Sequence, residues 1–334
     1  MVAIKNHQAI RHFISTHFAF CQNVFYMYQD DPPRFYQPQR HINYTCSVEE
    51  LLSPRFQNML RSAHANEYMV FNVGDTKFFC KTDFEIMVHC FLHNGVHQQE
   101  TMHYFFDLMK EHYHIDITDC SGKYFLDIGA NIGTTSIYVK KRIAPNMKIL
   151  AFEPVKENCR QFLCSCALND LQMGKDFVLV NAAVSSENST GEIMLSPEGN
   201  WGDNRVVKNS NFDAKWQTEK IKTLRLDNWL EENNISHSDI NCAWMDVQAH
   251  EAFVIEGGIN LFSKNSIPMI MEVWPSELRR NDSLDLLFKN LKICYRNYIC
   301  MDDYPRDATL RDIDTLESFI SASTRPFFDI FLIK

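Results

Sequence analysis

Residues 125–135 read FLDIGANIGTT, and this stretch decides the fold. An apolar run reaches Asp127, a glycine follows at Gly129, and a second glycine, Gly133, stands just before a segment that can form a helix. A buried strand that passes through a glycine-containing turn into a helix is typical of the first βα unit of an open α/β sheet. Gly129 lets the backbone turn tightly and approach a ligand, and Gly133 allows the helix to pack closely on the strand.

Further apolar runs follow the same plan along the rest of the chain. Nearly continuous apolar strands that alternate with helices predict a parallel sheet buried on both faces. The apolar runs are KYFLDI (123–128), KILAFE (148–153), DFVLV (176–180), CAWMDV (242–247), IPMIMEVW (267–274) and FFDIFLI (327–333). The helical patterns between them cover residues 134–142, 156–168, 251–262 and 276–290.

The chain before this core has a different character. The proline-rich stretch DDPPRFYQPQ (30–39) interrupts two segments with helical character, near 10–26 and 48–64. From Tyr68 onward, YMVFNV and TKFFC flank a Gly-Asp pair, which predicts a hairpin, and residues 100–112 have helical spacing.

These patterns divide the chain into two parts. We expect an N-terminal extension over residues 1–67 and a single domain over 68–334. Within that domain, 68–120 form a hairpin and helical lead-in, and 121–334 form the α/β core.

Composition limits the classes of protein to which the chain can belong. Its 334 residues carry a net charge of -9, which argues against broad binding to nucleic acid or to anionic membranes. No apolar run reaches the roughly 18 residues that span a bilayer. The 11 cysteines are odd in number and scattered, as expected of free thiols in a reducing compartment. We therefore expect a cytoplasmic enzyme; its oligomeric state is not indicated.

Three consecutive strand ends carry residues that predict a ligand. Asp127 places a carboxylate where the pyrophosphate of a dinucleotide would be repelled. Glu153 lies 20 residues beyond Gly133, where an acid binds ribose hydroxyls in βαβ nucleotide sites. Asn181 and Ala182 follow the third strand and leave room for a flat base. Together these ends predict a pocket for an adenosine with a positively charged tail, as in S-adenosylmethionine.

The order of motifs resembles a known family. DIGANIGTTSIYVKKR (127–142) is very similar to the opening motif of the FkbM family of class I S-adenosylmethionine-dependent methyltransferases. The resemblance runs from about residue 68 to 334 and does not cover 1–67. It implies a Rossmann-like class I fold, with a central, mostly parallel seven-stranded sheet flanked by helices. The later segments that match are AFEP (151–154), NAAVSSENSTGEIML (181–195), KTLRLDNWL (222–230), IPMIMEVW (267–274) and FDIFLIK (328–334).

The resemblance also implies which residues bind S-adenosyl-L-methionine. The first strand end would hold the methionine portion, Glu153 the ribose, and the third strand end the adenine. An ordinary strand-to-helix turn is the alternative for the first strand end, and a plain turn residue is the alternative for Asn181. The residues assigned to the cofactor are Asp127, Gly129, Asn131, Gly133, Glu153, Asn181, Ala182 and Asp246.

The fourth strand departs from the family pattern, which reads roughly Lys-Ile-Asp-Val-Glu/Gln-Gly-x-Glu. This chain has WMDVQAHE over residues 244–251, so Trp244 replaces the lysine and Ala249 replaces the glycine. If that glycine position needs a positive φ, Ala249 carries strain on the order of 1 kcal/mol, or the turn changes shape. Losing the lysine removes a positive charge from an acidic pocket.

Methyl transfer to a hydroxyl needs a base, because a neutral alcohol is a poor nucleophile. Asp246 lies at the carboxyl end of its strand, where open α/β sheets bind ligands. His250 could act as the base or as its relay, and Glu251 and Glu272 are further acids at strand ends. The alternatives are a solvated helix start for His250 and a helix cap for Asp246.

Two weaker features complete the set. His89, His93 and His97 have four-residue spacing, but Gly95 interrupts the helix, and no metal site is predicted. The turn-like stretch at 201–205 is a candidate substrate loop.

Three functions remain open on the sequence alone. The first is O-methylation of a hydroxyl on a small molecule, sugar or glycan. The second is a degenerate family member that binds the cofactor or a partner without turnover, motivated by Trp244 and Ala249. The third is RNA-directed methylation, which the acidic charge disfavours.

Overall fold

The computed structural model describes residues 68–196, 201–207 and 216–334. The expected extension over 1–67, with its two helical segments, lies outside the described residues. The chain as described starts with the predicted hairpin, in which β1 (Tyr68–Val73) pairs antiparallel with β2 (Thr76–Lys81).

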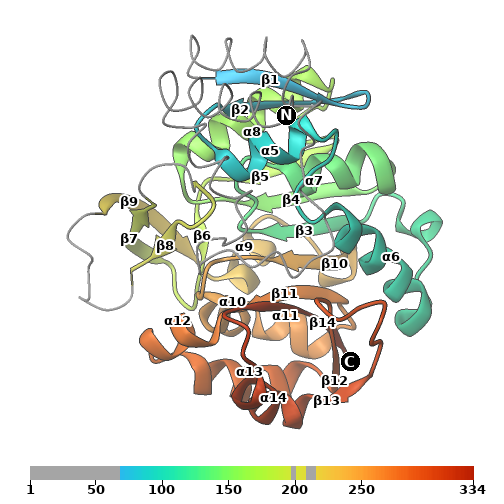
Figure 1. The fold of residues 1–334 in the computed structure, drawn as a ribbon, viewed down its shortest axis with the longest axis vertical. Helices are drawn as coiled ribbons and strands as arrows, with labels where there is room; N and C mark the ends of the chain where they lie inside the picture. The colour runs from blue at the N-terminus through green and yellow to red at the C-terminus, as the bar shows by residue number, and fades with distance from the viewer. Residues whose placement is uncertain (1–67, 197–200, 208–215) are drawn as a thin grey trace, which may run out of the picture.

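The core is an eight-stranded, mostly parallel sheet with the order β13-β12-β14-β11-β10-β3-β4-β5 (Figure 1). Its five consecutive strands β5-β4-β3-β10-β11 are parallel, and β14 runs antiparallel to both of its neighbours. The predicted fold class is confirmed. The eighth strand, β13, is a two-residue pairing at the edge. The bounds are β3 (Tyr124–Ile128), β4 (Lys148–Phe152), β5 (Phe177–Val180), β10 (Ile240–Met245), β11 (Met269–Val273), β12 (Asn297–Cys300), β13 (Arg311–Asp312) and β14 (Phe328–Ile333).

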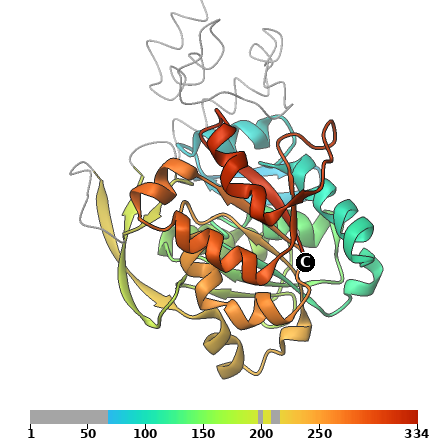
Figure 2. The same cartoon turned by 90° about the horizontal axis from the view of Figure 1, so that it is seen from below.

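Helices cover both faces of this sheet (Figures 1 and 2). Alternate residues of one strand enter different cores, because successive side chains of a strand point to opposite faces. Phe125 packs with α5, α6, α7 and α8, whereas Leu126 packs with α9, α10, α11, α13 and α14. The bounds are α5 (Glu85–Leu92), α6 (Gln99–Tyr113), α7 (Thr134–Tyr138), α8 (Lys156–Leu168), α9 (Leu226–Glu232), α10 (Glu251–Gly257), α11 (Ile259–Lys264), α12 (Pro275–Arg280), α13 (Leu284–Cys294) and α14 (Leu316–Ala322).

Two helices predicted as single elements are each divided in two. Gly258 separates α10 from α11, and a turn that includes Asp282, with φ of 52°, separates α12 from α13. The α7 segment continues as the π-helix Val139–Ile143. In the part of the chain that is described, no helix is long and apolar enough to cross a membrane.

A smaller sheet projects from the core (Figure 1). It has the order β6-β9-β7-β8, built from β6 (Ala183–Val184), β7 (Ser189–Leu195), β8 (Arg205–Val206) and β9 (Gln217–Leu224). Because β6 directly follows the third core strand, this sheet stands beside the carboxyl ends of the core strands.

Side chains of α8 fasten the hairpin to the core. The backbone N–H groups of Lys81, Phe79 and Lys77 donate to three side chains of α8 and its C-cap, with donor–acceptor distances of 2.9, 2.9 and 3.0 Å. The acceptors are Gln161, Ser165 and Asn169. The Asn169 amide also donates to the Lys77 carbonyl at 2.6 Å.

The spacing of these bonds follows from helix and strand geometry. Four residues of a helix rise about 6 Å, and two residues of a strand span about 6.6 Å. A polar side chain at every fourth helix position therefore meets every second amide of an adjacent strand edge. One turn earlier, Glu157 accepts from the Tyr68 hydroxyl at 2.8 Å. The helix thus takes the place of a third strand along the edge of β2.

Asn169→Ala should destabilise the protein by about 2–3 kcal/mol, because the buried amide is lost and both polar groups of Lys77 lose their partner. Urea unfolding measures the change. The exposed Asn233→Ala is the control and should change the free energy of unfolding by less than about 0.5 kcal/mol. If both variants changed the free energy of unfolding equally, the contact between Asn169 and the hairpin would not stabilise the protein.

Candidate active site

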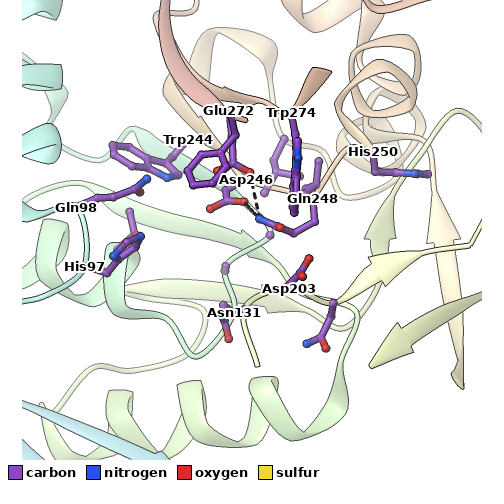
Figure 3. A pocket seen from close by; sticks show the side chains of 18 of the residues that line it. His97, Gln98, Asn131, Asp203, Trp244, Asp246, Gln248, His250, Glu272 and Trp274 are labelled. Carbon is purple, nitrogen blue, oxygen red and sulfur yellow. Dashed lines mark hydrogen bonds between the residues drawn. The ribbon is translucent and has the colours of Figure 1, made fainter. Parts of the chain in front are cut away.

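A cavity of about 1450 Å³ opens at the carboxyl ends of the parallel strands (Figure 3). Asp127 at the end of β3, Glu153 after β4 and Asp246 after β10 all line it. Ligands of open α/β sheets bind at this edge. The structure therefore brings together the three acids that the sequence analysis assigned to the cofactor.

Burial perturbs two of these acids. Asp127 is 1% exposed and accepts from the Ser136 hydroxyl at 2.5 Å; burial raises its pKa to about 7. Glu153 accepts backbone N–H groups from Asn131 at 2.9 Å and Val155 at 2.8 Å, but burial still raises its pKa to about 7. Both carboxyls can therefore change charge near neutral pH.

The two glycines of the first motif are required by packing. Gly129 has φ of +87°, and a Cβ there would lie 2.0 Å from the backbone oxygen of Asp246. Gly133 has φ of +84°, and a Cβ there would lie 2.5 Å from the Phe162 ring. Gly129 lines the cavity, whereas Gly133 packs against helix α8 rather than against the strand or the cavity.

Asn131 presents an acceptor at the cavity wall. Its backbone is left-handed, with φ of 50°, and its N–H donates to Glu153. Its Oδ1 is buried and has no hydrogen-bond partner among the described residues. A ligand with a donor group could satisfy this atom.

The third strand end is only partly as predicted. Ala182 lines the cavity, together with Ala183 and Val184. Asn181 does not: its amide donates to the carbonyls of Glu153 at 3.0 Å and Pro154 at 2.8 Å. Asn181 therefore holds the turn after β4 and is not among the residues that line the cavity.

Two residues of the turn after β10 have the left-handed backbone conformation that favours glycine. Gln248 and Ala249 have φ values of 53° and 69°, so of the two alternatives for Ala249, a strained positive φ or a changed turn, the structure has the positive φ. The Ala249 N–H donates to Glu251 Oε1 at 3.2 Å. This bond supports a backbone conformation that costs about 1 kcal/mol for a residue with a Cβ.

Glu251 is therefore a structural carboxyl and does not line the cavity, contrary to its assignment as a catalytic acid. It is fully buried, and its Oε2 has no hydrogen-bond partner among the described residues. Burial raises its pKa to about 8. The motif matched the family, but the first turn of α10 carries the side chain inward.

His250 borders the cavity but points away from the other candidates (Figure 3). It is 2% exposed, and its Nε2 lies 3.0 Å from Ser185 Oγ. It is neither a solvated helix-start residue nor directed at Asp246 or Glu272.

Asp246 and Glu272 do come together. The amide of Gln248 donates to Asp246 Oδ1 at 2.6 Å and to Glu272 Oε2 at 3.2 Å. In Figure 3 these groups lie between the rings of Trp244 and Trp274, which also line the cavity. The sequence did not predict that Gln248 bridges the two carboxyls, although Gln248 matched the motif.

The stretch from 201 to 206 also lines the cavity, as predicted for a substrate loop. Trp201 Nε1 donates to Asp83 at 3.1 Å, which ties one end to the hairpin side. At the other end, Arg205 binds Asp203 and Glu277, each at 2.7 Å, and stacks 4.5 Å over the Trp274 ring.

Acidic side chains outnumber basic ones in the cavity lining. Among the described residues, eight carboxyl groups line the cavity, against three guanidinium groups. The carboxyls are those of Glu100, Asp127, Glu153, Asp203, Asp246, Glu272, Glu277 and Asp302, and the guanidiniums are those of Arg205, Arg280 and Arg325.

The chain matches one known protein family. A family model described as the methyltransferase FkbM domain matches residues 127–298, which is more than half of the chain. No curated protein sequence matches significantly.

Solved structures were also compared. An FkbM methyltransferase from Methylobacillus flagellatus KT is 14% identical, with a TM-score of 0.39 over 64% of this chain and 44% of that chain. A precorrin-6y C5,15-methyltransferase from Geobacter metallireducens GS-15 is 11% identical, with a TM-score of 0.36 over 72% and 90%. A SAM-dependent O-methyltransferase from Thermotoga maritima is 11% identical, with a TM-score of 0.35 over 70% and 64%. This chain thus spans less than half the length of the Methylobacillus protein.

Glu251 should make stability depend on pH. Its pKa rises from 4.5 to about 8 on folding, so its contribution is complete below pH 4.5 and is lost as pH rises through about 8. Between these pH values the free energy of unfolding of the wild type should fall. Glu251→Gln, which mimics the protonated carboxyl, should make this decrease smaller by up to about 5 kcal/mol. Urea unfolding between those pH values measures it, with the exposed Glu231→Gln as control. A pH dependence identical to that of the wild type would disprove the assignment.

Proposed function

Since this chain belongs to the FkbM methyltransferase family, we propose that it transfers a methyl group from S-adenosylmethionine to a hydroxyl of a small molecule, a sugar or a glycan. The observation that carries the proposal is the convergence of Asp127, Glu153 and Asp246 on one cavity at adjacent strand ends. We extend the proposal to residues 68–334 as the catalytic domain, because the hairpin is bonded to α8 of the core.

The residues present fit S-adenosylmethionine. Asp127 and Asp246 offer negative charge to the sulfonium and ammonium groups. Glu153 can accept from ribose hydroxyls, and Ala182 leaves a flat surface for the base. The buried Oδ1 of Asn131 supplies an acceptor for a ligand donor.

The size of the cavity supports a second ligand beside the cofactor. Small-molecule sites commonly measure about 300–1,000 Å³. At about 1450 Å³, this cavity leaves space for an acceptor next to the cofactor. The acceptor then lies toward Gln248, Glu272 and Trp274, on the side away from Glu153.

When bound, S-adenosylmethionine supplies an electrophilic methyl group on a positively charged sulfur, which departs as a neutral thioether. An acceptor hydroxyl held in line with this methyl group would be the nucleophile. The hydroxyl proton passes to the Asp246 carboxylate, which Gln248 holds in place at 2.6 Å. Glu272, bonded to the same amide, orients the acceptor. Holding both reactants in line lowers the barrier by several kcal/mol.

A non-catalytic member of the family is the rival function. Trp244 stands where the family pattern has lysine, and this change is the observation that favours the rival. Ala249 no longer supports it, because the turn keeps a positive φ. RNA as acceptor fits poorly with the excess of carboxyls around the cavity. The nine free cysteines among the described residues agree with a cytoplasmic location.

Glu153→Gln should weaken binding of S-adenosylhomocysteine about tenfold, because the charge that strengthens bonds from ribose hydroxyls is lost. Calorimetry measures the affinity. The exposed Glu187→Gln is the matched control and should bind as the wild type does. Unchanged affinity in Glu153→Gln would exclude Glu153 from the binding site.

Asp246→Asn should lower turnover by about 100-fold while binding of S-adenosylhomocysteine falls much less, because the amide cannot take the hydroxyl proton. Transfer of label from S-adenosylmethionine to a pool of hydroxyl acceptors measures turnover. Equal loss of both properties would make Asp246 a binding residue only. If the wild-type protein binds the cofactor and labels no acceptor class, the non-catalytic function is correct.

A further inference from the structure

We infer that the acceptor carries a positively charged nitrogen, which Asp246 and Glu272 attract between the rings of Trp244 and Trp274. This inference rests on the proposed function and names the chemistry of the acceptor. Four independent features of the cavity support it.

The first feature is the overall charge of the cavity. The lining that the described residues form has five more carboxyls than guanidiniums. The cofactor brings a sulfonium, an ammonium and one carboxylate, and so offsets only one of these charges. A negative cavity attracts cations and repels anionic acceptors, such as phosphates and carboxylates.

The second feature is the pairing of all three arginines with carboxylates, and Arg280 lies 3.6 Å from Glu277. Arg205 binds Asp203 and Glu277, each at 2.7 Å. Arg325 binds Asp303 with two nitrogens, one of them at 2.9 Å. Since these guanidiniums are directed at protein carboxylates, they are poorly placed to recruit an anionic acceptor.

The third feature is the donor that joins Asp246 and Glu272. That donor is the uncharged amide of Gln248, at 2.6 and 3.2 Å. Glu272 is 8% exposed and stands opposite Asp329 in the β11–β14 pairing. Asp329 in turn accepts from the amide of Gln98 at 3.1 Å. Carboxylates thus accumulate at this end of the sheet, where a cationic ligand gains the most.

The fourth feature is the aromatic wall. Trp244 lines the cavity beside the carboxylates. The residue is 3% exposed, and its ring lies perpendicular to that of Phe105, at 6.0 Å between centroids. Trp274 lines the cavity on the other side, where the Arg205 guanidinium already stacks 4.5 Å from its ring centroid. Aromatic faces combined with carboxylates are the arrangement that recognises ammonium groups.

The test compares a cationic ligand with an uncharged ligand of the same shape and with an anionic ligand. Choline and its uncharged carbon analogue 3,3-dimethylbutan-1-ol both carry a hydroxyl, and 3-hydroxypropionate is the anionic probe. Each is titrated into protein saturated with S-adenosylhomocysteine, and binding is followed by NMR of the tryptophan indole N–H groups. We expect choline to bind at least tenfold more tightly than the neutral analogue, and the anion to bind more weakly than both.

Variants test whether Glu272 causes the preference for choline over its neutral analogue. Glu272→Gln should reduce choline affinity about tenfold and leave the neutral analogue unchanged, whereas the exposed Glu231→Gln should change neither. Equal binding of choline and its analogue, absence of choline binding, or a preference that survives in Glu272→Gln would overturn the inference. Failure to bind S-adenosylhomocysteine would contradict the proposed function instead, so the two failures are distinguishable.

Discussion

The close approach of two strand ends is the constraint on which the site depends. Gly129 lies so near the backbone oxygen of Asp246 that a Cβ would stand 2.0 Å away, which leaves room for no other residue. This contact places Asp127 and Asp246 on one wall, and the neighbouring strand adds Glu153 beside them. The close packing of the ends of β3 and β10 therefore places these carboxyls around one cavity.

Carboxylates that lie close together in a partly buried cavity repel one another. Two features of this protein reduce the repulsion. Asp127 and Glu153 have pKa values raised to about 7, so they can take up protons when no cation is near. Asp246 and Glu272 share the amide of Gln248 instead. Glu251 lies outside the cavity; burial raises the pKa of its carboxyl to about 8, and that carboxyl supports the left-handed turn at Ala249.

Periodicity and motif order were sufficient to predict the parallel sheet, the hairpin and the acids at strand ends. They could not predict side-chain direction within turns. His250 and Glu251 follow Asp246 closely, yet one faces Ser185 and the other the interior. The direction of each depends on backbone angles at Gln248 and Ala249, which no residue-type pattern fixes. The division between α10 and α11 and the bridging role of Gln248 likewise depend on tertiary packing.

The polar stripe of α8 has a consequence for the boundaries of the folding unit. The family match starts at residue 127, after the hairpin, yet Gln161 and Ser165 are buried only because β2 lies on them. A shortened protein that lacked β1 and β2 would open a row of amide and hydroxyl groups to water, next to the apolar surface that Phe78 now covers. Such a fragment would tend to associate with other chains through this bare edge, so the smallest soluble piece must retain the hairpin.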